Sequence, residues 1–339
     1  MRMFSFNVRE LERLSEKYTN HYDFCIQKVS ALDSLSDNSL LFVNKSMGAE
    51  LWEELRSHSN CLMILKCEDS VFDYDTLRKK NMVILSDNPR LDFARIFQFI
   101  LDTGSEETGA VPARIGENFS KGEYVVIKND SVIGDNVCID DRVSIGSDVH
   151  IGNNCHIMTG AVIKDHVTLG NHCIVRENCV IGGWGFGFQR DKDEIPVRLP
   201  HIGGVVIGNY VEVGALTTIA SGTFSPTRIG DYTKIDDHAH IAHNCHIGEK
   251  CYVMGGTVLC GSVKIGDRCH IAPQAGIIDG GITVGSDCTV GLGSVVKKSL
   301  ADGMVVSGNP AKPLTELVEE RTLHRLLKRR FHNEYLDCT

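Results

Sequence analysis

The sequence predicts a mainly β protein whose central part, from about residue 113 to residue 297, is a parallel β-helix of six-residue repeats. Three observations predict this fold. An aliphatic residue recurs at every sixth position, Gly, Asn or Asp follows many of these residues, and a small residue commonly lies four positions further on.

The aliphatic repeat is long and almost continuous. It runs from Ile127 to Ile181, from Ile207 to Ile219 and from Ile229 to Ile277, and after a one-residue slip it continues at Val284, Val290 and Val296. An α-helix would repeat apolar residues at spacings of three and four, and a lone strand would alternate at every second residue. Three short strands joined by tight corners explain a period of six. Residues one coil of 18 apart then lie side by side, at a strand spacing of about 4.8 Å.

Thirteen cysteines are many for a chain without an apparent export signal. The sequence contains no C-x-x-C pair, so a structural zinc site is not expected from it. Seven cysteines lie four residues after a repeat aliphatic, at Cys155, Cys173, Cys179, Cys245, Cys251, Cys269 and Cys288. At this second inward position a small apolar side chain packs well, so these thiols are predicted to belong to the core.

Composition narrows the classes of function. The net charge of −9 argues against nucleic acid as a general partner. No apolar run is long enough to span a bilayer, and the N-terminal residues do not resemble a signal peptide. A cytoplasmic location is therefore expected.

The chain divides into four segments. Residues 1–102 are predicted to form a small α/β domain, residues 103–112 a linker, residues 113–297 the β-helix, and residues 298–339 a C-terminal segment with a helix. The front domain is predicted to contain helices at Val8–Tyr18 and Pro89–Leu101 and strands at Leu40–Asn44, Leu62–Lys66 and Met82–Ser86. The C-terminal helix is predicted from about Leu314 to Tyr335.

Two insertions interrupt the repeat. The longer one lies between Ile181 and Ile207, and the shorter one lies around Thr223–Pro226. Loops that leave a repeat domain commonly carry its binding contacts, so substrate contacts are expected in these two segments.

The segment from Ile235 to His246 contains four histidines within nine residues. His243 lies two residues past the inward Ile241, and one coil further along the chain is Gly261. An imidazole next to a glycine with an unobstructed backbone N–H pairs a general base with an oxyanion donor. Acyl transfer from a thioester requires both.

Several motifs resemble the UDP-3-O-acylglucosamine N-acyltransferases of lipid A biosynthesis. The matching text is WGFGF (184–188), LPHIG (199–203), VEVGALTTI (211–219) and IDDHAHIAHNCHIG (235–248), with FVN (42–44) and NPRLDFA (88–94) in the front domain. The resemblance implies a left-handed β-helix, a homotrimer with active sites between adjacent subunits, and a uridine-binding front domain. It also implies N-acylation of a UDP-linked amino sugar.

The resemblance also implies roles for particular residues. His243 would take a proton from the sugar amine, the acidic Asp236 would orient the base or the sugar, and the N–H of Gly261 would hold the oxyanion. The residues implied to bind substrate are Asn44, Phe186, His201, His240 and Asn244.

The sequence departs from the family pattern around these residues. Leu41 and Met47 occupy the positions of two aromatic residues that flank the family's uracil-binding Asn, although Phe42 is near. Trp184 replaces an Asp, Ala220-Ser221-Gly222 replaces Asp-Arg-Gly, and Asp279-Gly280-Gly281 stands where the family has Asn-Gly-His. The catalytic residues are retained, whereas the residues that recognise the substrate have changed.

The sequence is compatible with two acyl donors. No tightly bound cofactor is expected, because the acyl group would arrive on phosphopantetheine, borne either by acyl carrier protein or by coenzyme A. The basic segment Arg321–Arg330 resembles a docking helix for an acidic carrier protein. Gly308–Lys312 (GNPAK) resembles the ending of acetyltransferases that use coenzyme A.

Three alternatives are distinguished from the leading hypothesis. A short-chain acyltransferase would use coenzyme A and another nucleotide-linked amino sugar, for a surface polysaccharide. A zinc lyase similar to the γ-carbonic anhydrases would use His238 and His243 as ligands, but no third histidine stands at an obvious stacking position. A scaffold without catalytic activity is the third alternative.

Overall fold

The computed structural model describes residues 5–32, 34–44, 48–66, 72–103 and 111–336, and the chain separates into two compact units. The β-helix unit comprises Ala113–Gly183, Val205–Ala220 and Thr227–Thr339. The N-terminal unit comprises Met1–Pro112 together with Trp184–Gly204 and Ser221–Pro226. Most of the predicted linker, residues 104–110, lies outside the described residues.

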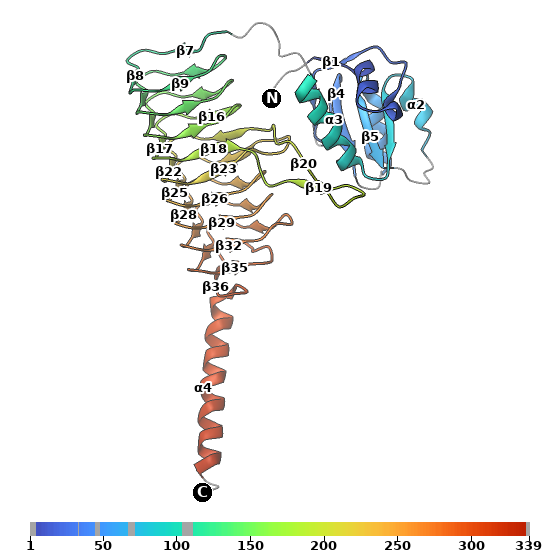
Figure 1. The fold of residues 1–339 in the computed structure, drawn as a ribbon. Helices are drawn as coiled ribbons and strands as arrows, with labels where there is room; N and C mark the ends of the chain where they lie inside the picture. The colour runs from blue at the N-terminus through green and yellow to red at the C-terminus, as the bar shows by residue number, and fades with distance from the viewer. Residues whose placement is uncertain (1–4, 33, 45–47, 67–71, 104–110, 337–339) are drawn as a thin grey trace. The chain divides into compact units, whose positions relative to one another are not determined.

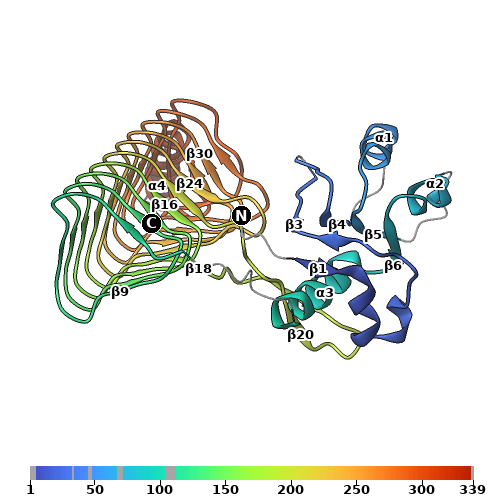
Figure 2. The same ribbon diagram turned by 90° about the horizontal axis from the view of Figure 1, so that it is seen from above.

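The β-helix unit has the predicted three-walled coil, and Figure 2 shows its stacked coils end-on. The first sheet consists of β7 (Arg114–Ile115), β10 (Val132–Ile133), β13 (His150–Ile151), β16 (Val167–Leu169), β21 (Val205–Ile207), β24 (Thr227–Ile229), β27 (His246–Ile247), β30 (Lys264–Ile265) and β33 (Thr283–Val284). The second consists of β8 (Ser120–Lys121), β11 (Cys138–Ile139), β14 (His156–Ile157), β17 (Ile174–Val175), β22 (Glu212–Val213), β25 (Lys234–Ile235), β28 (Tyr252–Val253), β31 (His270–Ile271), β34 (Thr289–Val290), β36 (Val305–Ser307) and β37 (Lys312–Pro313). The third consists of β9 (Val126–Ile127), β12 (Ser144–Ile145), β15 (Val162–Ile163), β18 (Val180–Gly183), β23 (Thr218–Ala220), β26 (His240–Ile241), β29 (Val258–Leu259), β32 (Gly276–Ile277) and β35 (Val295–Val296).

The repeat sets the register of these sheets. Val132 pairs with His150 and Ile133 with Ile151, so parallel partners are one 18-residue coil apart. At the corner between the first and second sheets, Asp135 Oδ1 accepts a hydrogen bond at 2.7 Å from the backbone N–H of Glu117, one coil earlier. Asn153 accepts the equivalent bond from Asp135 at 2.8 Å. The Asn and Asp side chains therefore satisfy corner amides that the short strands leave unpaired.

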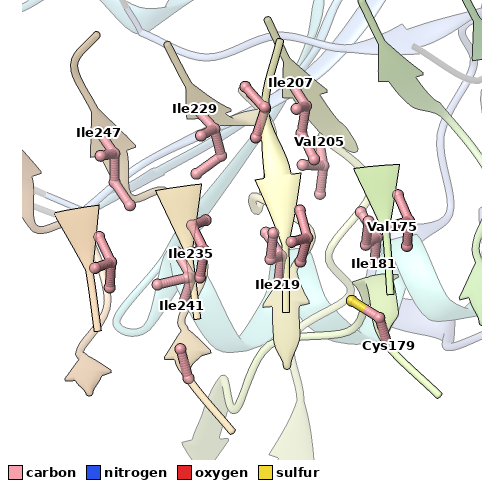
Figure 3. Close-up of a cluster of buried hydrophobic side chains, with 14 of the residues drawn as sticks. Val175, Cys179, Ile181, Val205, Ile207, Ile219, Ile229, Ile235, Ile241 and Ile247 are labelled. Atoms are coloured by element: carbon pink, nitrogen blue, oxygen red, sulfur yellow. The ribbon is translucent and has the colours of Figure 1, made fainter. Parts of the chain in front are cut away.

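The inward positions form one continuous core (Figure 3). Every repeat aliphatic from Ile133 to Val296 is buried, and Ile127 in the first coil is partly buried. All seven cysteines at the second inward position are buried free thiols, which confirms their predicted place in the core. Burial raises the pKa of Cys179 and of Cys245 to about 12.

The N-terminal unit contains a small parallel sheet in the order β3 (Lys28–Val29), β4 (Ser39–Val43), β5 (Leu62–Lys66), β6 (Met82–Ser86). Its α-helices are α1 (Ala49–Ser57), α2 (Tyr74–Arg78) and α3 (Pro89–Thr103), and β1 (Phe6–Asn7) pairs with β2 (Cys25–Ile26). The sequence predicts β5 and β6 with these bounds, and β4 and α3 within two residues. The helix predicted at Val8–Tyr18 is wrong, because this segment forms two 3₁₀ helices, η1 (Val8–Arg13) and η2 (Glu16–Tyr18).

Both insertions pack within the N-terminal unit. The longer one forms an antiparallel hairpin of β19 (Phe188–Arg190) and β20 (Pro196–Arg198). Leu199 and Ile202 from this insertion are buried with Phe93 of α3, and Arg95 of α3 forms an ion pair with Asp191 at 2.9 Å. The insertions are therefore part of the fold of this unit.

The chain after the repeats forms the predicted helix, α4 (Leu314–Leu336), in red in Figure 1. Before it, β36 continues the second sheet and β37 folds back antiparallel to β36. Over the described ranges, no helix has both the length and the apolar character needed to cross a membrane.

Candidate active site

His243 lies at the corner that joins the third sheet to the first, between β26 and β27. Its neighbours Ile241 and Cys245 point into the core and are buried, whereas His243 is half-buried on the outside. The two insertions interrupt this same corner in the two preceding coils, between β18 and β21 and between β23 and β24. His243 therefore occupies the first uninterrupted corner after both insertions.

The imidazole of His243 lies against the backbone of Gly261, as the repeat predicts. Strand β26 pairs with β29, so the two residues hold equivalent positions in successive coils. A Cβ built on Gly261 would lie 2.7 Å from Cε1 and 2.9 Å from Nε2 of His243. A side chain at residue 261 would therefore overlap the imidazole, and glycine leaves the room that the ring occupies.

Asn244 contacts the other side of the imidazole. Its Oδ1 lies 3.1 Å from Nδ1 of His243, and an amide oxygen can only accept a hydrogen bond. In the neutral ring, Nδ1 therefore carries the proton and Nε2 has the lone pair that a general base needs. The backbone N–H of Asn244 donates to Oγ1 of the buried Thr227 at 2.9 Å, which holds the backbone of Asn244 in position.

Asp236 lies at a different corner of the same chain. It follows β25 and so stands where the second sheet meets the third, and its Oδ2 accepts a hydrogen bond from Gly255 N–H at 3.0 Å. The neighbouring Asp237 accepts from Ala215 N–H at 2.7 Å and from the Arg176 guanidinium at 3.0 Å. Within one chain, Asp236 and His243 lie on opposite borders of the third sheet.

His240 lies on the outer face of the third sheet, in β26. One of its ring nitrogens, Nδ1, is 2.7 Å from Oγ1 of Thr218. Partial loss of water around the ring lowers the pKa of His240. His238 lies at the corner of Asp236, so the two histidines of the zinc hypothesis, His238 and His243, are at different corners of the coil.

Asn44 lines a cavity of about 280 Å³ within the N-terminal unit. The remaining lining residues are Ser30, Ala31, Leu32, Phe42 and Phe224. The rings of Phe42 and Phe224 are 5.9 Å apart and tilted by 69°. Leu41 belongs to the core on the opposite face of β4, and Met47 lies outside the described residues. The aromatic side chains that line the cavity with Asn44 are therefore Phe42 and Phe224. In the sequence, the only sign that Phe224 contributes to a site is its position in the shorter insertion.

His201 and Phe186 come from the longer insertion. His201 is buried, and its Cε1 would lie 2.7 Å from a Cβ built on Gly187, so glycine is required next to the ring. Phe186 is 90% exposed and its ring contacts Phe188 at a centroid distance of 5.0 Å. Of the site residues predicted from sequence, Gly261 and Asn244 contact His243, whereas Asp236 lies at another corner of the β-helix unit. Three others, Asn44, Phe186 and His201, belong to the N-terminal unit.

Family models match the repeat region. Residues 226–261 and 244–279 match the bacterial transferase hexapeptide model of six repeats, and residues 115–187 match the GMPPB C-terminal domain. A solved UDP-N-acetylglucosamine acyltransferase from Arabidopsis is 27% identical, with a TM-score of 0.53 over 61% of this chain and 72% of that chain. The chain is therefore a hexapeptide-repeat protein with the β-helix fold of an acyltransferase.

Curated relatives show which acyltransferases the chain resembles in sequence. A UDP-3-O-acylglucosamine N-acyltransferase from Campylobacter concisus is 37% identical over 140 residues, which are 41% of this chain and 43% of the relative. One from Methylococcus capsulatus is 32% identical over 141 residues, 42% of this chain and 40% of the relative. The chain is thus related to the UDP-3-O-acylglucosamine N-acyltransferases, and the match spans less than half the length of either relative.

Proposed function

We propose that this protein transfers an acyl group from a phosphopantetheine thioester to the amine of a UDP-linked amino sugar. The observation that carries the proposal is the contact between the His243 imidazole and Gly261. This contact supports the proposal because an imidazole can act as a base, and the residue beside it is a glycine, which adds no side chain of its own next to its backbone N–H. The two residues lie on the corner that both insertions interrupt in the preceding coils. The names of the curated relatives support the same reaction.

The proposed reaction needs one base and one oxyanion donor. Nε2 of His243 removes a proton from the sugar amine as its nitrogen attacks the thioester carbonyl, and the N–H of Gly261 binds the oxyanion. Collapse of the tetrahedral intermediate breaks the C–S bond, and the imidazolium returns its proton to the departing thiolate. Asn244 keeps the ring oriented through Nδ1 during both proton transfers.

The nucleotide is proposed to bind in the cavity at Asn44. Phe42 and Phe224 offer apolar ring surface to a pyrimidine, and the Asn44 amide offers both a donor and an acceptor to its polar edge. In this proposal Phe224 takes the role of the aromatic residue that the UDP-3-O-acylglucosamine N-acyltransferases have at the position of Leu41.

The active protein is proposed to be a homotrimer. Asp236 and His243 border the same sheet from opposite corners, so a second copy against this sheet can bring its own Asp236 to His243. Apart from His240, the outer face of the third sheet carries mostly small and apolar residues, among them Val126 (53% exposed) and Val258 (42% exposed). Exposed valines in register on one face suit a contact between copies.

Acyl carrier protein is the proposed acyl donor, bound through the basic segment Arg321–Arg330 of α4. The reaction is proposed to take place in the cytoplasm. Incubation with acyl carrier protein thioesters, coenzyme A thioesters and a panel of UDP-amino sugars tests donor and acceptor together. Turnover with acetyl-coenzyme A alone would favour the short-chain alternative.

The base is tested by His243→Ala, with His270→Ala as a matched control on the outer face of the second sheet. We expect His243→Ala to lower kcat by at least about 10²-fold with assembly unchanged, because a positioned base contributes about 10²–10⁴-fold. The control should retain activity. Full activity of His243→Ala would exclude this residue as the base and would leave the scaffold alternative open.

A further inference from the structure

Three metal-binding side chains lie together on the outer face of the second sheet, away from the corner of His243. Cys138 in β11 and His156 in β14 are direct partners in neighbouring parallel strands. Each precedes an inward isoleucine, so both side chains project outward. Asp140 follows Ile139 and returns to the same side. Over the described residues, this is the one group of three such side chains close enough to share an ion.

The distances fit a small tetrahedral ion. Nε2 of His156 lies 2.9 Å from Oδ1 of Asp140, and Sγ of Cys138 lies 3.8 Å from the same oxygen. All three ligand atoms lie within 4.8 Å of one another. Zinc bonds of about 2.0–2.3 Å at tetrahedral angles put ligand atoms about 3.3–3.8 Å apart. Side-chain adjustments of less than about 1 Å would therefore complete the geometry.

We propose that Cys138, Asp140 and His156 bind one Zn²⁺ ion. A thiolate, an imidazole nitrogen and a carboxylate oxygen suit zinc, whereas magnesium and calcium prefer oxygen ligands alone. Binding releases the thiol proton of Cys138 and requires His156 to be neutral. The three residues are only half-buried, so water can occupy the fourth position.

The ion would join two successive coils near the N-terminal end of the β-helix. Strand β8, on the other side of β11, is exposed at both Ser120 and Lys121, and the first strand, β7, is exposed throughout. Terminal repeats have a neighbour on one side only and are the least stabilised part of a repeat protein. A clip between β11 and β14 would therefore stabilise the end of the coil, independently of acyl transfer.

The experiment uses the full chain, stripped with a chelator and then given one equivalent of Zn²⁺ or Co²⁺. We expect about one bound ion per chain, a thiolate-to-cobalt charge-transfer band, and a higher melting temperature with zinc. Cys138→Ser and His156→Gln should abolish the band and the stabilisation. The matched controls Cys25→Ser and His270→Gln alter other half-exposed or exposed side chains and should keep both.

The outcomes separate this site from the catalytic corner. His243→Ala should bind zinc as the wild type does, and the stripped protein should retain acyl transfer. Absence of stoichiometric binding, or binding that survives both Cys138→Ser and His156→Gln, would overturn the proposal. Loss of zinc in His243→Ala alone would overturn it as well and would favour the zinc lyase.

Discussion

Replacing Gly261 by alanine perturbs the contact on which the proposed chemistry depends. The new methyl group would lie 2.7 Å from Cε1 and 2.9 Å from Nε2 of His243, whereas ordinary contacts of a Cβ are 3.4–4 Å. The imidazole must therefore move by at least about 0.7 Å, and displacements near 1 Å at a reacting centre can cost about 10²-fold in rate. We expect kcat to fall by about 10- to 100-fold, equivalent to about 1.4–2.7 kcal/mol of activation free energy.

The assay compares steady-state kcat, KM and melting temperature for wild type, Gly261→Ala and Gly276→Ala. Gly276 is a matched control in the third sheet, because an added Cβ there meets no atom of the described residues within 4 Å. Its neighbour Val258 lies on the face proposed to contact a second copy, so the assembly state of each variant is measured as well. A double variant with His243→Ala completes the test: if the methyl group acts only through the imidazole, the double variant should be no slower than His243→Ala alone. An unchanged kcat in Gly261→Ala would refute the reasoning. So would a loss that adds fully to that of His243→Ala.

Three further predictions concern the cavity, the assembly and the core thiols. Phe224→Ala should raise KM for the UDP-sugar with kcat nearly unchanged, and calorimetry with UDP should show weaker binding; equal affinity would exclude the cavity as the nucleotide site. Mixed trimers of His243→Ala and Asp236→Asn should recover about a quarter of the active sites if the two residues meet between copies, whereas no recovery in verified mixed trimers would exclude that arrangement. Stability should fall as pH rises from about 9 towards 12, because unfolding releases the protons of Cys179 and Cys245, whose pKa values of about 12 keep them protonated in the fold. Each thiol contributes up to about 4 kcal/mol to this loss, so Cys179→Ala should flatten the stability profile measured by denaturant titration.

The β-helix could be predicted almost completely because each coil repeats the same physical requirement. An inward aliphatic, a small second inward residue and a polar corner recur along the repeats. The fold can therefore be predicted even where one repeat departs from the pattern. The same redundancy predicts that His243 and Gly261 meet, since both occupy the same place in successive coils.

The N-terminal unit could be predicted only in part. Strands β5 and β6 are short apolar runs, so the local composition of the sequence predicts them. Segment Val8–Tyr18 has helical spacing but forms two 3₁₀ helices, each capped by a side chain, Asn7 or Ser15. Packing of the two insertions into this unit depends on tertiary contacts such as Arg95 with Asp191, which no local pattern contains.

Closeness in the sequence has a different meaning in a coil of three walls. The four histidines between Ile235 and His246 suggest one dense site, but a new wall or corner is reached every few residues. His238 lies where the second sheet meets the third, His240 on the third sheet, His243 where the third meets the first, and His246 on the first sheet.

The neighbours of these histidines are instead one coil away. His246 is flanked in register by Arg228 and Lys264, and burial together with these two cations lowers its pKa. His243 meets Gly261, and Cys138 meets His156, by the same rule. A search of such a sequence for functional groups therefore has to compare residues 18 positions apart, corrected for each insertion, before it compares residues that are adjacent in the chain.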